Sequence, residues 1–152
     1  KGAKVVPDIS APVLKEVLTQ GPFLIKPNDE ELMDIFGLPT TTDEEILTAL
    51  KILHEKGAKH ILLTMGAKGS YFYDGESCYY CEAFPVTLVS SACCGDGFLG
   101  AFLSEWLKDR ENVVDALKLA AATGANVAES AALGDFANVE RYREQIKVKR
   151  LV

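Results

Sequence analysis

The stretch VSSACCGDGFLGAFLSEWL, residues 89–107, decides how the rest of this chain is interpreted. Small residues lead up to Gly95, an acid follows at Asp96, and an apolar pattern with helical spacing then begins. Two interpretations compete here. The stretch is either a glycine-rich dinucleotide loop of the form G-x-G-x-x-G, or an anion-binding turn at a helix start in which Asp96 accepts a proton.

The composition indicates one globular domain. The chain has 152 residues, of which 48% are hydrophobic and 25% charged, and this is enough for a single sizeable core. The net charge of −6 argues against nucleic-acid or membrane partners, because both need clustered Lys and Arg. No apolar run approaches the roughly 20 residues that span a bilayer.

Four cysteines, at positions 78, 81, 93 and 94, raise the alternative of a zinc site. We disfavour it because Cys78 and Cys81 lie in a strand-like run, where an offset of three points side chains to opposite faces. Free, reduced thiols in a cytoplasmic protein are the preferred interpretation.

Strands and helices are expected to alternate along the chain. Buried strands are predicted at residues 3–10, 23–26 and 60–65, a hairpin at 70–84, and a final strand at 147–152. Helices are predicted at residues 11–19, 28–37, 43–57, 95–107, 112–132 and 139–146, with capping residues at Asn28, Thr42 and Asn138. This alternation predicts an α/β fold with a mainly parallel sheet flanked by helices. Ligands lie beyond the carboxyl ends of such strands, so residues 26–28, 64–66 and 90–96 are expected to converge.

The dinucleotide interpretation fails because the second part of the Rossmann fingerprint is absent. A Rossmann fingerprint requires a second strand that ends in an acid about 20 residues beyond the glycines. The acid at that distance, Asp115, falls inside the predicted helix 112–132. A nicotinamide cofactor is therefore rejected, and no Walker A pattern occurs either.

The run from Ser90 to Leu103 resembles the C-terminal signature of the PfkB, or ribokinase-like, sugar kinases, usually (D/N/S)-T-x-G-A-G-D followed by a helix. Three further motifs agree in order: Val6–Ser10 with D-x-S, Lys26–Leu32 with K-P-N-x-x-E-L, and Thr64–Gly69 with T/S-x-G-x-x-G. Cys93 and Cys94 replace the usual Gly-Ala, which strains Cys93 if its position needs a positive φ.

The resemblance covers nearly the whole chain, as the C-terminal half of a family member. It implies a ribokinase-like, Rossmann-type three-layer fold that lacks its N-terminal half and lid, with residues 1–152 forming the nucleotide-binding and catalytic-base part. The implied reaction is ATP-dependent phosphoryl transfer to a sugar phosphate, most simply fructose 1-phosphate, because K-P-N-x-x-E-L points to the branch of 1-phosphofructokinase and tagatose-6-phosphate kinase. The fragment alone is expected to be inactive, and the full-length protein to be a homodimer. The alternative of another class is a non-catalytic fragment or interaction module that keeps the fold.

The resemblance also implies roles for individual residues. Asp96 is the catalytic base, and the backbone at Cys93, Cys94 and Gly95 forms the anion hole. ATP is bound by a set drawn from four segments: Lys26, Asn28, Thr64, Gly66, Gly69, Gly124 and Asn126. Asn28 and Glu31 hold Mg²⁺ through water. Two plainer alternatives remain open: Asn28 and Glu31 as a capping box, and Asp96 as an acid that matches the helix dipole.

Overall fold

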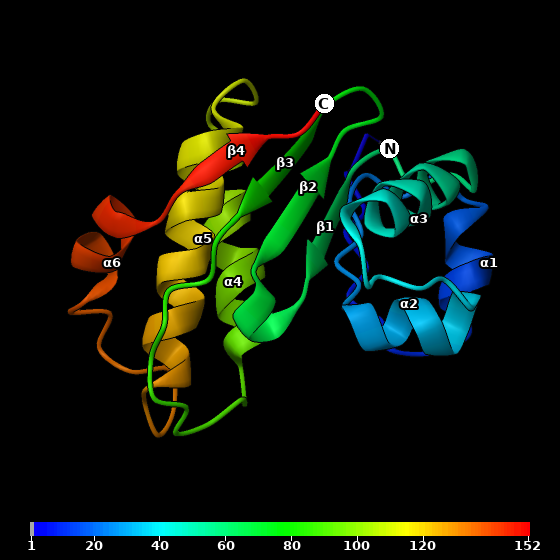
Figure 1. Cartoon of the computed structure of the whole chain (residues 1–152). Coiled ribbons are helices and arrows are strands. Elements are labelled where there is room, and N and C mark those ends of the chain that lie inside the picture. The colour runs from blue at the N-terminus through cyan, green and yellow to red at the C-terminus, as the bar shows by residue number, and fades with distance from the viewer. Residues whose placement is uncertain (1) are drawn as a thin grey trace. The chain divides into compact units, whose positions relative to one another are not determined.

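A computed structural model describes residues 2–152, and these divide into two compact units. Unit 1 contains the described residues up to Met65, together with Tyr71–Cys78 and Leu151–Val152. Unit 2 contains Gly66–Ser70 and Tyr79–Arg150. Helices α1 to α3 belong to unit 1 and helices α4 to α6 to unit 2 (Figure 1).

Three helices and the first strand lie in unit 1, and each is shorter than its predicted range. The elements are α1 (Leu14–Leu18), α2 (Asp29–Phe36), α3 (Asp43–Glu55) and β1 (Ile61–Thr64). Helix α3 buries Ile46, Ala49, Leu50 and Leu53, which recur at helical spacing, and it contacts β1. Helix α2 ends at Gly37, whose φ of 67° is the left-handed conformation that glycine adopts at little cost.

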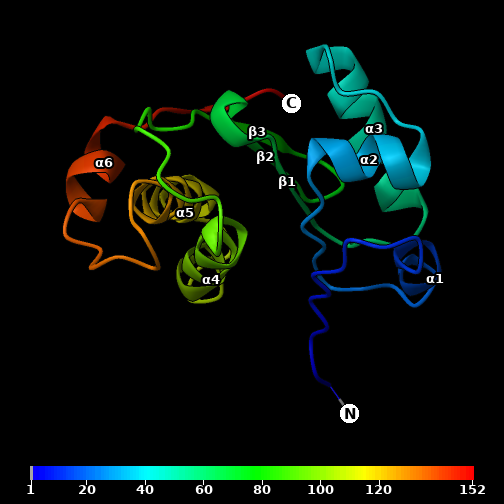
Figure 2. The ribbon, with the colours of Figure 1, turned by 90° about the horizontal axis from the view of Figure 1, so that it is seen from below.

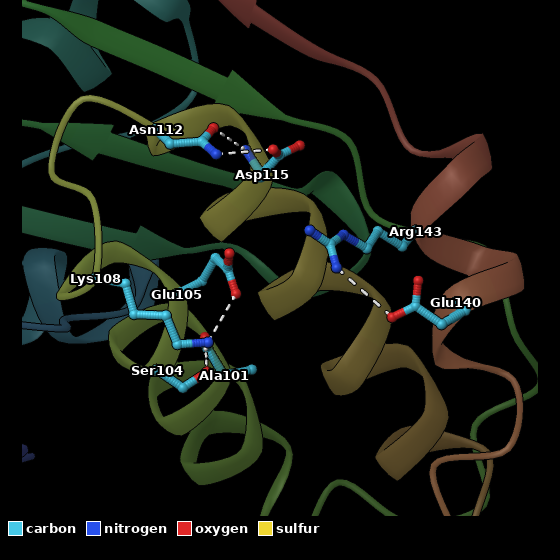
Figure 3. A network of polar contacts seen from close by, with 8 residues as sticks. All are labelled: Ala101, Ser104, Glu105, Lys108, Asn112, Asp115, Glu140 and Arg143. Carbon is cyan, nitrogen blue, oxygen red and sulfur yellow. Dashed lines mark hydrogen bonds and ion pairs between the residues drawn. The ribbon is translucent and has the colours of Figure 1, made fainter.

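Unit 2 is organised around α5 (Val113–Ala128). This helix lies beside α4 (Cys94–Trp106), as Figures 1 and 2 both show, and it also contacts α6 (Val139–Gln145) and β4 (Val148–Arg150). Its first turn is capped by Asn112, whose side chain accepts a hydrogen bond from the Asp115 amide and donates one to the Asp115 carboxylate (Figure 3). The 3₁₀ turn η1 (Gly66–Lys68) belongs to the same unit.

Strand pairing is antiparallel where a ladder is described, and parallel contacts occur as isolated bridges. Strands β2 (Ser70–Tyr73) and β3 (Cys78–Cys81) each have residues in both units. Within unit 1, β1 and β2 are neighbours in the sheet, and residues 25–28 run parallel to β1 through bridges Ile25↔Ile61 and Asn28↔Thr64. Within unit 2, β3 pairs antiparallel with β4 in the register Tyr79↔Arg150, Tyr80↔Lys149, Cys81↔Val148. The turn after β2 is closed by Asp74, whose Oδ1 accepts hydrogen bonds from the amides of Glu76 and Ser77.

Several expectations need correction. The predicted strands at 3–10 and 23–26 do not form ladders; they share one backbone bond, from Phe23 N to Val5 O, besides the isolated bridges to β1. The segment before Ser90 is irregular, and the mainly parallel sheet is not confirmed. The capping box expected at Thr42 is only half made, because the Glu45 carboxylate accepts from the Thr41 amide instead. The predicted strand at the C-terminal end is confirmed as β4, and the hairpin strands as β2 and β3.

Among residues 2–152, every helix is too short or too polar to cross a bilayer.

Candidate active site

Helix α4 begins without a side-chain cap. The residue before it, Cys93, has φ 61° and ψ 2°, a left-handed conformation that is uncommon outside glycine, and its side chain makes no capping hydrogen bond. The backbone strain expected at Cys93 is therefore present. The family's usual glycine would adopt the same conformation without a steric cost.

Two backbone amides at this helix start are free. The Gly97 amide donates to Cys93 O at 2.9 Å, and the Cys94 amide donates to Ser91 O at 3.4 Å. Within residues 2–152, the amides of Gly95 and Asp96 donate no hydrogen bond. Unpaired amides at the positive end of a helix dipole attract anions, so the first turn of α4 is chemically suited to a phosphate group.

Asp96 is the third residue of α4, and its side chain is exposed. In the described part of the chain, its carboxylate makes neither a hydrogen bond nor an ion pair. An ionised carboxylate in this position is open to accept a proton from a hydroxyl that approaches the same helix end. The same position suits a plain dipole-matching acid, and the geometry is compatible with both roles.

The four cysteines fall into two environments. Cys78 and Cys81 are fully buried, and burial raises the pKa of Cys78 to about 11 and that of Cys81 to about 12. Cys93 is exposed, and Cys94 is half-buried, with a pKa raised by its burial and a contact from its Sγ to Ser90 O. Within residues 2–152, no cluster of three or more His, Cys, Asp or Glu side chains is placed to hold a metal ion.

In unit 1, Asn28 and Glu31 form a complete capping box at the start of α2. The Glu31 amide donates to Asn28 Oδ1 at 2.8 Å, and the Asn28 amide donates to Glu31 Oε2 at 3.0 Å. The second carboxylate oxygen, Oε1, accepts no hydrogen bond from residues 2–152. One free oxygen suits a metal held through water, as Mg²⁺ usually is, better than a metal coordinated by several side chains.

The bridge between Asn28 and Thr64 places the K-P-N motif beside the end of β1, and the Thr64 amide donates to Pro27 O at 3.0 Å. Lys26 lies in the same segment with its side chain 9% exposed, and its Nζ is 3.3 Å from Asp8 Oδ2. A nearly buried ammonium needs such a partner. Sequence reasoning matched both motifs but missed their pairing, although opposite charges at the ends of two predicted strands were a usable signal.

Gly66 and Gly69 both have positive φ but differ in their surroundings. A Cβ added at Gly66 would meet nothing within 4 Å, whereas one at Gly69 would clash with the backbone oxygen of Cys81. Gly69 is therefore required for packing in unit 2. Gly66 leaves open space in which a ligand has room to approach the backbone.

Gly124 and Asn126 lie on the part of α5 that packs on the start of α4. A Cβ at Gly124 would lie 3.5 Å from the Phe98 ring and 3.9 Å from Cys94 O. Asn126 is 2% exposed and donates to Glu129, which also accepts from Asn138 and Tyr142. No periodic pattern or motif in the sequence indicated this Glu129 cluster.

Comparison with known proteins assigns the family. Residues 2–138 match the model of the pfkB family carbohydrate kinases, and the chain belongs to this family. It is 50% identical over 151 residues to a D-tagatose-1-phosphate kinase of Klebsiella oxytoca, covering 99% of this chain and 49% of the relative. It is 33% identical over 151 residues to a 1-phosphofructokinase of Bacillus subtilis, covering 99% of this chain and 50% of the relative.

Solved structures agree on the ribokinase-like fold. Arabidopsis thaliana ribokinase, solved with ribose and ATP, matches with a TM-score of 0.81 at 27% identity, over 94% of this chain and 48% of that chain. Phosphofructokinase-2 of Escherichia coli, solved with substrates and products, matches with a TM-score of 0.84 at 22% identity, over 95% and 48% of the two chains. The chain thus spans about half the length of the relatives it matches.

Proposed function

We propose that residues 1–152 are the nucleotide-binding and catalytic-base part of an ATP-dependent kinase that phosphorylates a hydroxyl of a sugar phosphate. One observation carries the proposal: the uncapped start of α4 offers two free amides beside the open carboxylate of Asp96. Family membership supports reading this helix end as a phosphoryl-transfer site rather than as an unused anion site. The alternative is a non-catalytic module that keeps the fold.

In the proposed mechanism, the helix end holds the transferred phosphoryl group and Asp96 receives the proton. The free amides of Gly95 and Asp96, together with the backbone at Cys93 and Cys94, bind the phosphate oxygens and stabilise their charge. The acceptor hydroxyl attacks the γ-phosphorus, the bond to the β-phosphate oxygen breaks, and the hydroxyl proton passes to Asp96. Because such transition states are loose, positioning and charge stabilisation contribute more than early deprotonation.

The remaining assignments concern the nucleotide and its metal. We assign ATP contacts to the residues that the resemblance implies: Lys26, Asn28, Thr64, Gly66, Gly69, Gly124 and Asn126. Mg²⁺ fits Asn28 and Glu31 only through water, because the capping box occupies one oxygen of each side chain. When bound, Mg²⁺ neutralises phosphate charge. Lys26 Nζ lies 3.3 Å from Asp8 Oδ2, and this ion pair positions the nearly buried side chain that we assign to ATP.

The acceptor sugar is proposed from the relatives. Two of them are named for D-tagatose 1-phosphate and for 1-phosphofructokinase activity, so a ketohexose 1-phosphate is the proposed class. Fructose 1-phosphate is the acceptor expected from the motif, but the higher identity, 50% against 33%, favours D-tagatose 1-phosphate. A coupled assay of the complete kinase with both sugars, and with tagatose 6-phosphate as the third candidate, decides among them.

Location and assembly complete the proposal. Free thiols and an acidic net charge support a cytoplasmic protein that binds neither nucleic acid nor membrane. A homodimer of the complete protein is proposed as well; a structure of Escherichia coli phosphofructokinase-2 is described as a tetrameric inhibited form.

The test is a titration of the ¹⁵N-labelled chain with ATP and Mg²⁺. We expect amide shifts at residues 64–69 and 92–96, with weak affinity because the chain spans half of its relatives. NADH serves as the control nucleotide and should not shift these amide resonances. If ATP shifts neither segment, the kinase assignment fails and the non-catalytic module becomes the better description.

A further inference from the structure

The three helices of unit 1, α1, α2 and α3 (Figure 1), surround a small pocket. Its volume is about 260 Å³, and it is lined by Lys15 of α1, Thr19 directly after α1, Phe36 at the end of α2, and Lys56 directly after α3. Phe36 lies at the opposite end of α2 from Asn28. The pocket therefore contains none of the residues that we assign to ATP, Mg²⁺ or proton transfer.

Two ammonium groups share this pocket without an acid beside them. Lys15 and Lys56 are exposed, and no carboxylate within residues 2–152 forms an ion pair with either of them. Lys15 Nζ lies 5.9 Å from the centre of the Phe36 ring, so one of the charges is placed over the apolar part of the pocket. Like charges at one pocket repel each other, and an anion bound between them removes the repulsion.

A plainer role for the two lysines is to match the negative ends of the helix dipoles. The carbonyl groups at these helix ends already accept hydrogen bonds, however. Glu16 O accepts from the amide and the hydroxyl of Thr19, at 3.2 and 2.7 Å, and Ile52 O accepts from the amide of Lys56 at 3.0 Å. The ammonium groups of Lys15 and Lys56 make no hydrogen bond in the described part of the chain, so both are available to a ligand.

We propose that this pocket binds a small phosphate monoester, with the phosphate between Lys15 and Lys56 and the organic part against the ring of Phe36. A phosphate dianion matches two ammonium charges. The half-buried ring offers an apolar surface, which an ester covers and inorganic phosphate leaves in contact with water. The pocket is smaller than the roughly 300–1,000 Å³ of most ligand sites, so a compact ester suits it better than a nucleoside triphosphate. This site does not depend on the proposed kinase function.

The test is an amide-shift titration of the ¹⁵N-labelled whole chain with phenyl phosphate and, separately, with inorganic phosphate. Phenyl phosphate is a monoester whose flat ring can stack on Phe36. We expect it to shift the amides of the four lining residues and to bind there about tenfold more tightly than inorganic phosphate, because only the ester covers the ring. Both affinities should fall as salt is added, since the two ammonium groups are exposed and salt screens their charge.

Substitutions separate the contributions of charge and ring. Lys15→Gln and Lys56→Gln each remove one ammonium group, and we expect each to weaken phenyl phosphate binding about tenfold. Phe36→Leu keeps an apolar side chain without the flat ring, so the preference for the ester over inorganic phosphate should fall. The matched control is Lys51→Gln, the same chemical change at an exposed lysine of α3 that does not line the pocket, and it should bind like the wild type.

Three results would overturn the inference. The first is unchanged binding of phenyl phosphate when Lys15→Gln and Lys56→Gln are combined. Both positions are exposed, and a cooperative thermal transition verifies the fold, so this variant decides the matter even if Phe36→Leu does not fold. The second is equal affinity of the wild type for phenyl phosphate and inorganic phosphate, because the ring would then have no role. The third is a set of shifts confined to residues 92–97, which would leave the proposed function intact.

Discussion

Helices α2 and α4 each carry an acid at their third position, Glu31 and Asp96, yet the two acids have opposite environments. In α2, Asn28 caps the helix and Glu31 reaches back to it, so both side chains satisfy backbone amides. In α4, the preceding residue is a left-handed cysteine with no side-chain cap, and the acid stays unpaired. The residue before a helix therefore determines whether the first backbone amides are bonded by the helix's own side chains or left free for a ligand.

We expect the largest effect at the uncapped start of α4, from a substitution of Asp96. Asp96→Asn keeps the size of the side chain and removes the proton acceptor. In the complete kinase we expect phosphoryl transfer to fall by at least about 100-fold, the usual range for loss of a general base, while ATP affinity holds or rises slightly. Steady-state kinetics beside nucleotide binding measures this. If the variant keeps a near-normal kcat, Asp96 is not the catalytic base and only matches the helix dipole.

At the capped start of α2, we expect a substitution of Asn28 to lower the stability of the fold. Asn28→Ala removes the acceptor for the Glu31 amide and disrupts the capping box, so we expect a loss of about 1–2 kcal/mol in the free energy of unfolding. Denaturant unfolding measures it, and Asn28→Asp, which restores an acceptor oxygen, should recover most of the loss. If Asn28→Ala leaves stability unchanged, the two helix starts do not differ as described.

Cys93→Gly tests the backbone strain before α4. Glycine adopts the left-handed conformation without steric cost, so we expect stabilisation of up to about 1 kcal/mol. The matched control is Cys94→Gly, one residue further on and inside the helix, which should destabilise by about 0.5–1 kcal/mol. Opposite signs at adjacent cysteines, seen in thermal or denaturant unfolding, would confirm the strain; equal signs would contradict it.

The smallest expected effect concerns Glu129. Its carboxylate accepts a hydrogen bond from Asn138, whose side chain does not cap α6. Because folding lowers the pKa of Glu129 below its ordinary 4.5, its contribution to stability is present above that pH and is lost as the pH falls through the folded-state pKa. The stability difference between wild type and Glu129→Gln should therefore narrow below pH 4.5. A difference that stays constant from pH 7 to pH 3 would show that the charge of Glu129 is irrelevant.

The helices were more predictable from the sequence than the sheet. Asn28 and Gly37 bound α2 as expected, because capping is a local effect of a few residues. The strands expected at 3–10 and 23–26 rested on short apolar runs, and strand pairing depends on partners far away in sequence. Such runs show that a segment is buried, as Leu24 and Ile25 are, but not that it forms a ladder.

The candidate site was predictable where it consists of backbone and small residues. The positive φ of Cys93, which the motif made a condition for strain, is present, and so is a helix start without a side-chain cap; anion binding at this end of α4 stays a prediction. The Lys26–Asp8 ion pair and the Glu129 cluster were missed because each joins side chains from different elements. Contacts of this kind depend on tertiary packing, which a periodicity argument does not resolve.

The contrast among the cysteines also has a practical consequence. Cys78 and Cys81 have no solvent access, and Cys94 is half-covered, so a thiol-reactive dye has one readily accessible target in the native chain, Cys93. That residue immediately precedes the open helix start, and the wild-type chain therefore carries its own attachment point for a fluorescent reporter. Each phosphate compound that occupies the helix end would then change the emission of a single dye, without any cysteine being removed or introduced.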